Sequence, residues 1–168
     1  MEKVVDSYRF ISGITRRMLR TWVEMETPRP IPFTPLCKPV NQSKVALISS
    51  AGIALKTDKA FDQEGERQNP WWGDPSYRVI PNTATEADVR LYHMHIDPRP
   101  AAQDLNCLFP LARLMEMEQR GEIGSSAEQH FSMMGYILQP EQLLRETVPA
   151  MIRDLRAEHA DVVVLVPA

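Results

Sequence analysis

The sequence predicts an α/β domain, because strand-like apolar runs alternate with amphipathic helical segments along its 168 residues. The clearest strand signals are the continuous apolar runs at residues 44–55 and 161–167, which are typical of strands buried in a parallel sheet. A helical segment at residues 140–159 lies directly before the second run. Helices that connect parallel strands form right-handed crossovers, so we expect a three-layer parallel sheet, flavodoxin-like or Rossmann-like.

Residues 1–43 are expected to form an N-terminal helix followed by a proline-rich extended arm. Residues 4–26 carry apolar side chains at helical intervals, for example Met18 and Trp22. Proline fixes φ and lacks an amide hydrogen, so the stretch that follows is incompatible with a helix. We therefore place the α/β domain at residues 44–168. The prolines of the arm are Pro28, Pro30, Pro32, Pro35 and Pro39.

Shorter elements are expected between the two buried strands. Residues 56–75 are rich in charge, asparagine, glycine and proline, and predict a long loop. A helix over residues 104–120 is expected to end at Gly121, since glycine adopts the left-handed conformation that closes a helix. The remaining expected elements are strands at residues 77–80 and 89–96, a short helix at 125–130, and a strand or turn at 133–138.

The first candidate site residues are His93, His95 and Asp97, at the end of the strand expected over residues 89–96. Side chains alternate between the two faces of a strand, so these three are expected to share one face. Open α/β sheets bind ligands beyond the carboxyl ends of their strands, and we therefore expect a substrate-binding pocket here. The alternative is a metal site, because histidine and carboxylate side chains also bind transition metals.

Two further pairs of residues are expected to bind substrate near this pocket. Ser50 and Gly52 follow the first strand, where small residues allow backbone amides to approach a carboxylate; a tight turn without a ligand is the alternative. Asp74 and Arg78 lie in a polar segment before the next strand. Arg78 is expected either to hold a substrate carboxylate or to pair with Asp74 and fix the loop.

Asp104 and His130 complete the set of expected substrate-binding residues. Asp104 precedes the expected helix and is suited both to capping it and to facing the histidines across a crevice. His130 follows the expected short helix and is placed to reach the same crevice, although a lone histidine is also a common structural residue. The two cysteines, Cys37 and Cys107, lack metal-ligand spacing, and we expect Cys107 to be a buried, inert thiol.

Composition excludes some classes of partner. The formal net charge of -3 and the pI near 5.8 give no electrostatic basis for binding nucleic acid or an anionic membrane. No apolar run approaches the roughly 20 residues that span a bilayer. Two widely separated cysteines do not require an oxidising compartment, so we expect a cytoplasmic protein.

Several sequence blocks point to a family. Residues 22–168 contain, in this order, IPFTPLCKPVNQSKVALISSAGIAL, GDPSYRVIP, HMHID, DLNCLFPLARLMEMEQRGEIG, HFSMMGY and DVVVLVP. In content and order these blocks resemble the glycine/sarcosine/betaine reductase selenoprotein B family, and they are also similar to the selenoprotein subunit of D-proline reductase. The resemblance implies an oxidoreductase of amino-acid metabolism that cleaves a C–N bond reductively in glycine-, betaine-, sarcosine- or proline-type substrates.

The resemblance also implies how such a protein works. Family members use a selenocysteine as a selenolate nucleophile, a neighbouring cysteine, a dithiol/disulfide couple, and partner subunits, one of which carries a pyruvoyl group. No cofactor is evident in this chain itself. The family's Cys/Sec motif follows a strand that resembles residues 162–167, where this chain stops, so no residue here matches the nucleophile.

Three interpretations of this departure remain open. The chain is a fragment stopped at an unread selenocysteine codon, in which case its last strand leaves an apolar edge that favours homo-oligomers. Alternatively, it is a short non-catalytic homologue that binds a small carboxylate or regulates a partner. The third interpretation is a metal-dependent hydrolase that uses His93, His95 and Asp97.

Overall fold

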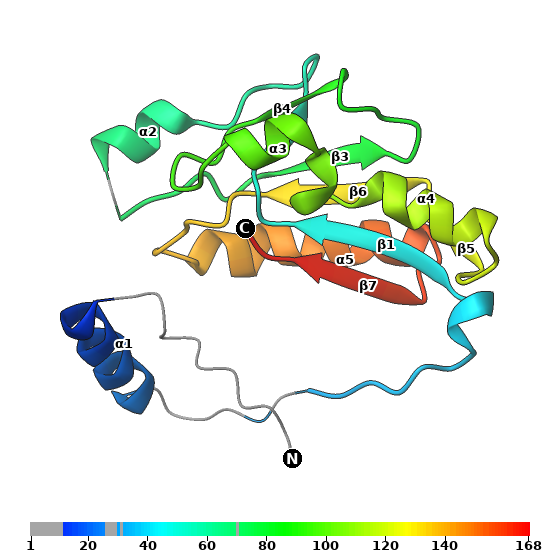
Figure 1. Cartoon of the computed structure of the whole chain (residues 1–168), viewed down its shortest axis with the longest axis horizontal. Coiled ribbons are helices and arrows are strands. Elements are labelled where there is room, and N and C mark those ends of the chain that lie inside the picture. The colour runs from blue at the N-terminus through cyan, green and yellow to red at the C-terminus, as the bar shows by residue number, and fades with distance from the viewer. Residues whose placement is uncertain (1–11, 26–29, 31, 70) are drawn as a thin grey trace. The chain divides into compact units, whose positions relative to one another are not determined.

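The computed structural model describes residues 12–25, 30, 32–69 and 71–168 (Figure 1). The chain divides into two compact units, Met1–Pro35 and Leu36–Ala168, and each is considered by itself. The first unit contains helix α1 (Gly13–Met25), whose start is capped by Ser12 Oγ, which accepts the amide of Thr15. The helix expected over residues 4–26 is confirmed for Gly13–Met25; Ser12 precedes it as its cap, and residues 4–11 and 26 lie outside the described residues. The boundary at residue 44 stays a prediction.

The second unit is built on a five-stranded sheet with β1 (Lys44–Ser49) in its interior. On one side, β1 pairs in parallel with β7, in the register Val45↔Val162 to Ser49↔Val166. On the other side, it pairs in parallel first with β5 and then with β6, and β3 pairs with the outer edge of β6. The bounds of these strands are β3 Tyr77–Pro81, β5 Ser125–Ser126, β6 Gln129–Met133 and β7 Val162–Val166.

The expected α/β class is confirmed, but the expectation of a purely parallel sheet is wrong. Strand β3 runs antiparallel to β6, with Tyr77 opposite Met133 and Pro81 opposite Gln129. The apolar pattern of a short strand does not encode its direction, which depends on the partner it finds. Pro81 is compatible with this outer position, because proline has no amide hydrogen to donate to a ladder and is therefore found mainly in edge strands.

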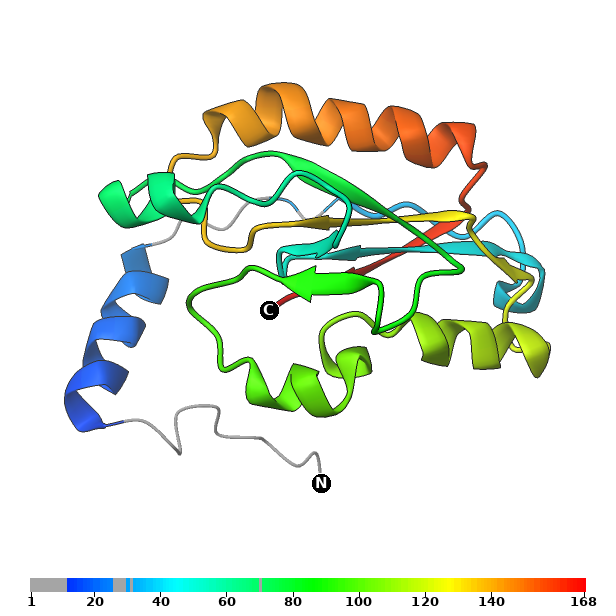
Figure 2. The same cartoon turned by 90° about the horizontal axis from the view of Figure 1, so that it is seen from above.

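Helices cover both faces of the sheet. Helix α4 (Leu111–Gln119) lies on one face and α5 (Val148–Ala157) on the other, as the two perpendicular views show (Figures 1 and 2). The π-helical turn η3 (Leu143–Thr147) continues directly into α5, which confirms the helix expected at residues 140–159. No helix among the described residues is long and apolar enough to cross a membrane.

The apolar run at residues 44–55 is two strands, not one. Strand β1 ends at Ser49, the chain turns at Gly52, and β2 (Ile53–Leu55) pairs antiparallel with β4 (Val89–Leu91) in a separate two-stranded sheet. Gly52 has a φ of 64°, and a β-carbon there would collide with the sulfur of Met134. Glycine is therefore required at this turn.

Four other expected elements differ from the structure. The strand expected at residues 89–96 stops at Leu91, and the helix expected from residue 104 begins only at Leu111, since Pro110 disfavours helical backbone at the residue before it. The segment expected as a short helix at 125–130 forms β5 and β6, and the loop expected at residues 56–75 contains helix α2 (Gln63–Gln68). Residues 133–138 leave β6 after Met133 and turn, which is one of the two forms expected for them. The remaining short elements are η1 (Val40–Gln42), α3 (Arg99–Gln103) and η2 (Leu105–Cys107).

The main core lies between the sheet and α4. Leu47, Ile80 and Phe109 are fully buried there and pack in one cluster. Strand β7, in contrast, is largely exposed, although its apolar sequence predicts a buried strand: Leu165 retains 71% of its accessible surface. Its position at the edge of the sheet explains the difference, because no described strand pairs with its outer side.

Candidate functional site

The carboxyl ends of the parallel strands β1, β6 and β7 meet at one end of the sheet. Ser50, directly after β1, donates its amide to Val166 O of β7 at 3.0 Å and accepts the amide of Ala168 on its Oγ at 2.8 Å. Gly135, two residues after β6, packs so closely that a β-carbon on it would lie 2.9 Å from Ser50 O. We call the region formed by Ser50, Gly52, Gly135 and Ala168 the carboxyl edge.

His93 lies over the carboxyl edge, in the loop between β4 and α3. Its side chain is buried, and its Nε2 lies 3.0 Å from the position that a β-carbon of Gly135 would occupy. Its Nδ1 accepts the backbone N–H of His95 at 3.2 Å. Burial and the neighbouring His95 lower the pKa of His93, and Glu66 opposes this only in part. His93 is therefore neutral near pH 7, and with Nδ1 as an acceptor its proton resides on Nε2.

His95 is held by two residues that sequence reasoning missed. Its Nε2 donates to Glu66 Oε1 at 2.7 Å, and the ring of Tyr136 lies over its own ring at 4.1 Å between centroids. Glu66 is 3% exposed, although it belongs to the segment expected as a long loop. Helix α2 is too short to show a helical pattern of apolar residues, so the sequence does not distinguish Glu66 from the exposed Glu64. Tyr136 follows the glycine of the HFSMMGY block, close to the end of β6. This position near a strand end was the only feature of the sequence that could have indicated Tyr136 as a site residue.

Asp97 does not share a face with the two histidines. Strand β4 ends at Leu91, so strand alternation does not apply to residues 93–97. The Asp97 carboxylate is exposed and forms an ion pair with Arg99 at 2.6 Å. Across the described parts of the chain, no group of three or more histidine, cysteine, aspartate or glutamate residues is placed to hold a metal ion. The donor set that a metal-dependent hydrolase would need is therefore not brought together.

Asp74 and Arg78 hold the loop before β3 in place. Burial alone would raise the pKa of Asp74, but hydrogen bonds from Ser76 and Asp62 and the charge of Arg78 keep this pKa below its ordinary value. The Arg78 guanidinium lies 4.1 Å from the ring centroid of Phe61, and its N–H groups are already in use. They donate to Lys59 O, Ala60 O, Ser76 Oγ and Tyr77 O. Both residues line a depression of about 640 Å³ that includes none of the carboxyl-edge residues.

Asp104 and His130 have structural partners. Asp104 caps η2 by accepting the amide of Asn106 at 2.9 Å, on the protein surface. His130 is completely buried in β6, where its Nδ1 accepts the amide of Leu47 at 3.0 Å and its Nε2 lies 3.1 Å from Ser126 Oγ. Burial lowers the pKa of His130 to about 4. It is therefore a neutral histidine that completes the sheet.

Of the expected site residues, the structure thus brings Ser50, Gly52, His93 and His95 together. Asp74, Arg78, Asp97, Asp104 and His130 are committed to contacts elsewhere, as described above. That any of these nine residues binds substrate stays a prediction. Both cysteines are free and exposed, so the expectation that Cys107 is buried is wrong.

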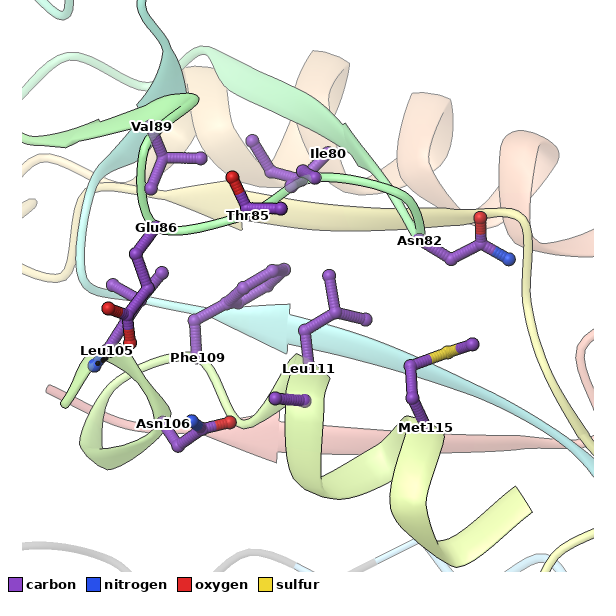
Figure 3. Close-up of a pocket in the computed structure, with 12 residues that line it drawn as sticks. Ile80, Asn82, Thr85, Glu86, Val89, Leu105, Asn106, Phe109, Leu111 and Met115 are labelled. Carbon is purple, nitrogen blue, oxygen red and sulfur yellow. Dashed lines mark hydrogen bonds between the residues drawn. The ribbon is translucent and has the colours of Figure 1, made fainter. Parts of the chain in front are cut away.

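A separate cavity of about 250 Å³ lies between the end of β3 and the start of α4 (Figure 3). Its walls are mainly apolar, with Ile80, Phe109 and Met115 among them. Two polar groups at its rim already have partners: Thr85 Oγ1 donates to Asp88, and Glu86 Oε1 accepts the amide of Leu105. The residues that line this cavity include neither His93 nor any carboxyl-edge residue, so it is distinct from that region.

Comparison with known proteins assigns the chain to a family. The model of the glycine/sarcosine/betaine reductase selenoprotein B family matches residues 4–168. The chain is also 32% identical over 139 residues to the D-proline reductase subunit gamma of Acetoanaerobium sticklandii. That alignment covers 83% of this chain and 54% of the relative, so the chain spans about half of the relative's length. No solved structure matches the chain.

Proposed function

Because the chain belongs to the glycine/sarcosine/betaine reductase selenoprotein B family, we propose that it is a reductase-type subunit whose reaction crevice opens at the carboxyl edge. The proposed reaction is the reductive cleavage of a C–N bond in a small amino-acid-type substrate of the glycine, betaine, sarcosine or proline class. The C–N bond is replaced by a C–H and an N–H bond. The two electrons and two protons come from a dithiol, which becomes a disulfide.

The observation that carries this proposal is that the end of β7 and the His93 side chain both lie beside Ser50 and Gly135. Ala168, which follows β7, is hydrogen-bonded to Ser50, and Gly135 packs against both Ser50 and the Nε2 of His93. By resemblance, we expect a Cys/Sec motif after the strand that matches β7. A nucleophile at that point would enter the crevice beside a buried imidazole, in a site lined by backbone groups and small residues.

The proposal extends to the partners and the setting of the reaction. By resemblance, the pyruvoyl group belongs to a partner subunit, so we assign no residue of this chain to it. Dithiol chemistry requires a reducing compartment, and we accordingly place the reaction in the cytoplasm.

The coding sequence that follows the Ala168 codon tests the proposal directly. We expect a cysteine codon or an in-frame UGA, followed within a few codons by a cysteine. The product of the complete reading frame, with its partner subunit and dithiothreitol, is then expected to release the amine or open the ring of one of the four substrates. An ordinary terminator at this point, together with an inactive product, would refute the reductase proposal.

A second candidate function, a binding subunit without catalysis, is supported by the positions of the two cysteines. Cys37 precedes β1 and Cys107 belongs to η2, and neither is part of the carboxyl edge or hydrogen-bonded to it. The described residues at the edge therefore offer donors for a small carboxylate but no thiol nucleophile. Calorimetric titration with acetate, glycine and betaine distinguishes the candidates, because this one predicts saturable binding in a protein that releases no amine.

A further inference from the structure

The contacts around His93 assign a task to residues that do not themselves face the carboxyl edge. We propose that Glu66 and His95 are positioning residues, which hold His93 so that its Nε2–H points at the carboxyl edge. In this position His93 acts as a hydrogen-bond donor and not as a general base. The functional meaning of this arrangement rests on the proposed location of the site, but its geometry can be tested without any substrate.

The first step is the bonding state of His93. A neutral imidazole has one donor nitrogen and one acceptor nitrogen. The acceptor is Nδ1, because it receives the backbone N–H of His95 at 3.2 Å. The donor is therefore Nε2, which faces Gly135 and Ser50 and has no hydrogen-bond partner among the residues that the structure describes. A lone pair on Nε2 would require the opposite tautomer and would break the bond from His95.

The second step is the support of the His95 backbone. Residues 92–98 belong to neither a strand nor a helix, so the position of this N–H depends on side-chain contacts. The His95 ring lies between Glu66 and Tyr136, with a 2.7 Å hydrogen bond to the former and a ring contact with the latter. Glu66 is fixed in turn, because it is buried in α2, whose first turn is capped by Asp62.

The third step concerns the other oxygen of Glu66. Its Oε2 is buried and has no hydrogen-bond partner in the described structure. A buried, unpaired carboxylate oxygen costs free energy that a purely structural salt bridge would not require. Its position beside His95 supports a residue that serves the site through His95 and not by contact with a ligand.

This tautomer determines which chemical group of a ligand His93 can bind. An Nε2–H donor stabilises a carboxylate or a carbonyl oxygen, and it does not abstract a proton. In a reductive cleavage, the part of the substrate suited to this donor is an oxygen-bearing group next to the carbon that is attacked.

Nitrogen NMR of the imidazoles tests the positioning directly. In the wild-type chain, long-range ¹H–¹⁵N spectra are expected to show His93 as a single Nε2–H tautomer, and the His95 amide is expected to exchange slowly with solvent. In Glu66→Ala, we expect that amide to exchange about tenfold faster, the effect of losing one charge-assisted hydrogen bond, and the His93 nitrogens to shift toward a tautomer average.

Two further variants separate positioning from a general loss of folding. Glu64→Ala removes an exposed carboxylate from the same helix. The partners of this carboxylate are Gln68 and Arg67, so the His95 amide exchange and the His93 nitrogen signals should stay unchanged. Glu66→Gln keeps an oxygen that can accept from His95 and should restore most of the wild-type spectrum.

Either of two results would overturn the inference. One is a wild-type spectrum in which His93 carries its proton on Nδ1. The other is a folded Glu66→Ala variant with unchanged His93 and His95 signals. Neither result depends on catalysis, so failure of the reductase proposal would be recognised separately, by the absence of amine release.

Discussion

At the scale of single residues, His130 shows how a titratable side chain can be part of a sheet. Strand β1 pairs with β5 at Val45 and with β6 from Ile48 onward, so the amide of Leu47 falls in the gap between the two ladders. The imidazole Nδ1 of His130 accepts this amide and replaces the missing backbone carbonyl. A buried amide without an acceptor would be costly, which explains why a polar side chain is completely buried here.

This role predicts that the protein loses stability in mild acid. The pKa of His130 is about 4 in the folded protein, against 6.5 ordinarily, so the unfolded state binds more protons between these values. The free energy of unfolding should therefore be fully retained above pH 6.5 and should fall as the pH drops toward 4, by up to about 1 kcal/mol per pH unit. Urea denaturation from pH 7.5 to pH 4.5 measures this slope.

Two variants test whether His130 causes the slope. His130→Asn offers an amide oxygen near the position of Nδ1 but does not titrate, so its slope should be smaller than that of the wild type. His159→Asn is the control, because His159 is exposed and its φ of 56° is one that asparagine tolerates. An equal loss of slope in both variants would contradict the assignment.

Gly135 leads to a second prediction at this scale. A β-carbon there would lie 2.9 Å from Ser50 O and 3.0 Å from Nε2 of His93, both tighter than ordinary contacts. Gly135→Ala should therefore displace His93 and cost about 1–3 kcal/mol of stability, as overpacking does. Thermal unfolding and the His93 NMR signals measure the two effects. Gly13→Ala, where a β-carbon meets no atom within 4 Å, should change neither.

The sequence identified some of these residues and missed others for a physical reason. His93 and His95 were predicted as site residues because their chemistry is visible in the HMH triplet. Glu66 was missed, since its burial depends on α2 packing against a loop 29 residues further along the chain. Long-range contacts of this kind leave no local pattern, so one sequence does not show which glutamate is buried.

At the scale of elements, the length of each strand depends on its partner. Residues 89–96 alternate as a strand would, yet β4 ends at Leu91 because β2, its partner, starts only at Ile53 after the turn at Gly52. The positions of the helix formed by η3 and α5 and of strand β7 were predicted well, since local patterns signal both, but the burial expected for β7 was wrong. Strand direction and pairing, in contrast, required contacts between segments that are distant in sequence.

The cap of α2 gives a prediction at this scale. Asp62 accepts the amide of Gly65 at 2.8 Å and so fixes the start of the helix that carries Glu66. Asp62→Ala should cost about 1 kcal/mol and should increase amide exchange in α2 and at His95. Asp62→Asn keeps a capping oxygen and should behave like the wild type. Unchanged exchange at His95 in a folded Asp62→Ala variant would show that α2 does not support the site.

At the scale of the whole molecule, strand β7 presents an apolar edge. Val163, Val164 and Leu165 retain between 37% and 71% of their accessible surface, and no described strand pairs with the outer side of β7. An exposed apolar edge strand is a template for pairing with another chain. The wild-type chain is therefore expected to form dimers or larger species through β7.

Leu165→Lys places a charge on this strand and should shift the protein toward the monomer. Sedimentation velocity at protein concentrations between about 5 and 200 µM measures this shift, because weak interfaces respond in that range. Leu144→Lys changes a similarly exposed leucine on η3 and should leave the association state unchanged. If the wild-type chain is monomeric over the whole range, the outer side of β7 does not drive self-association.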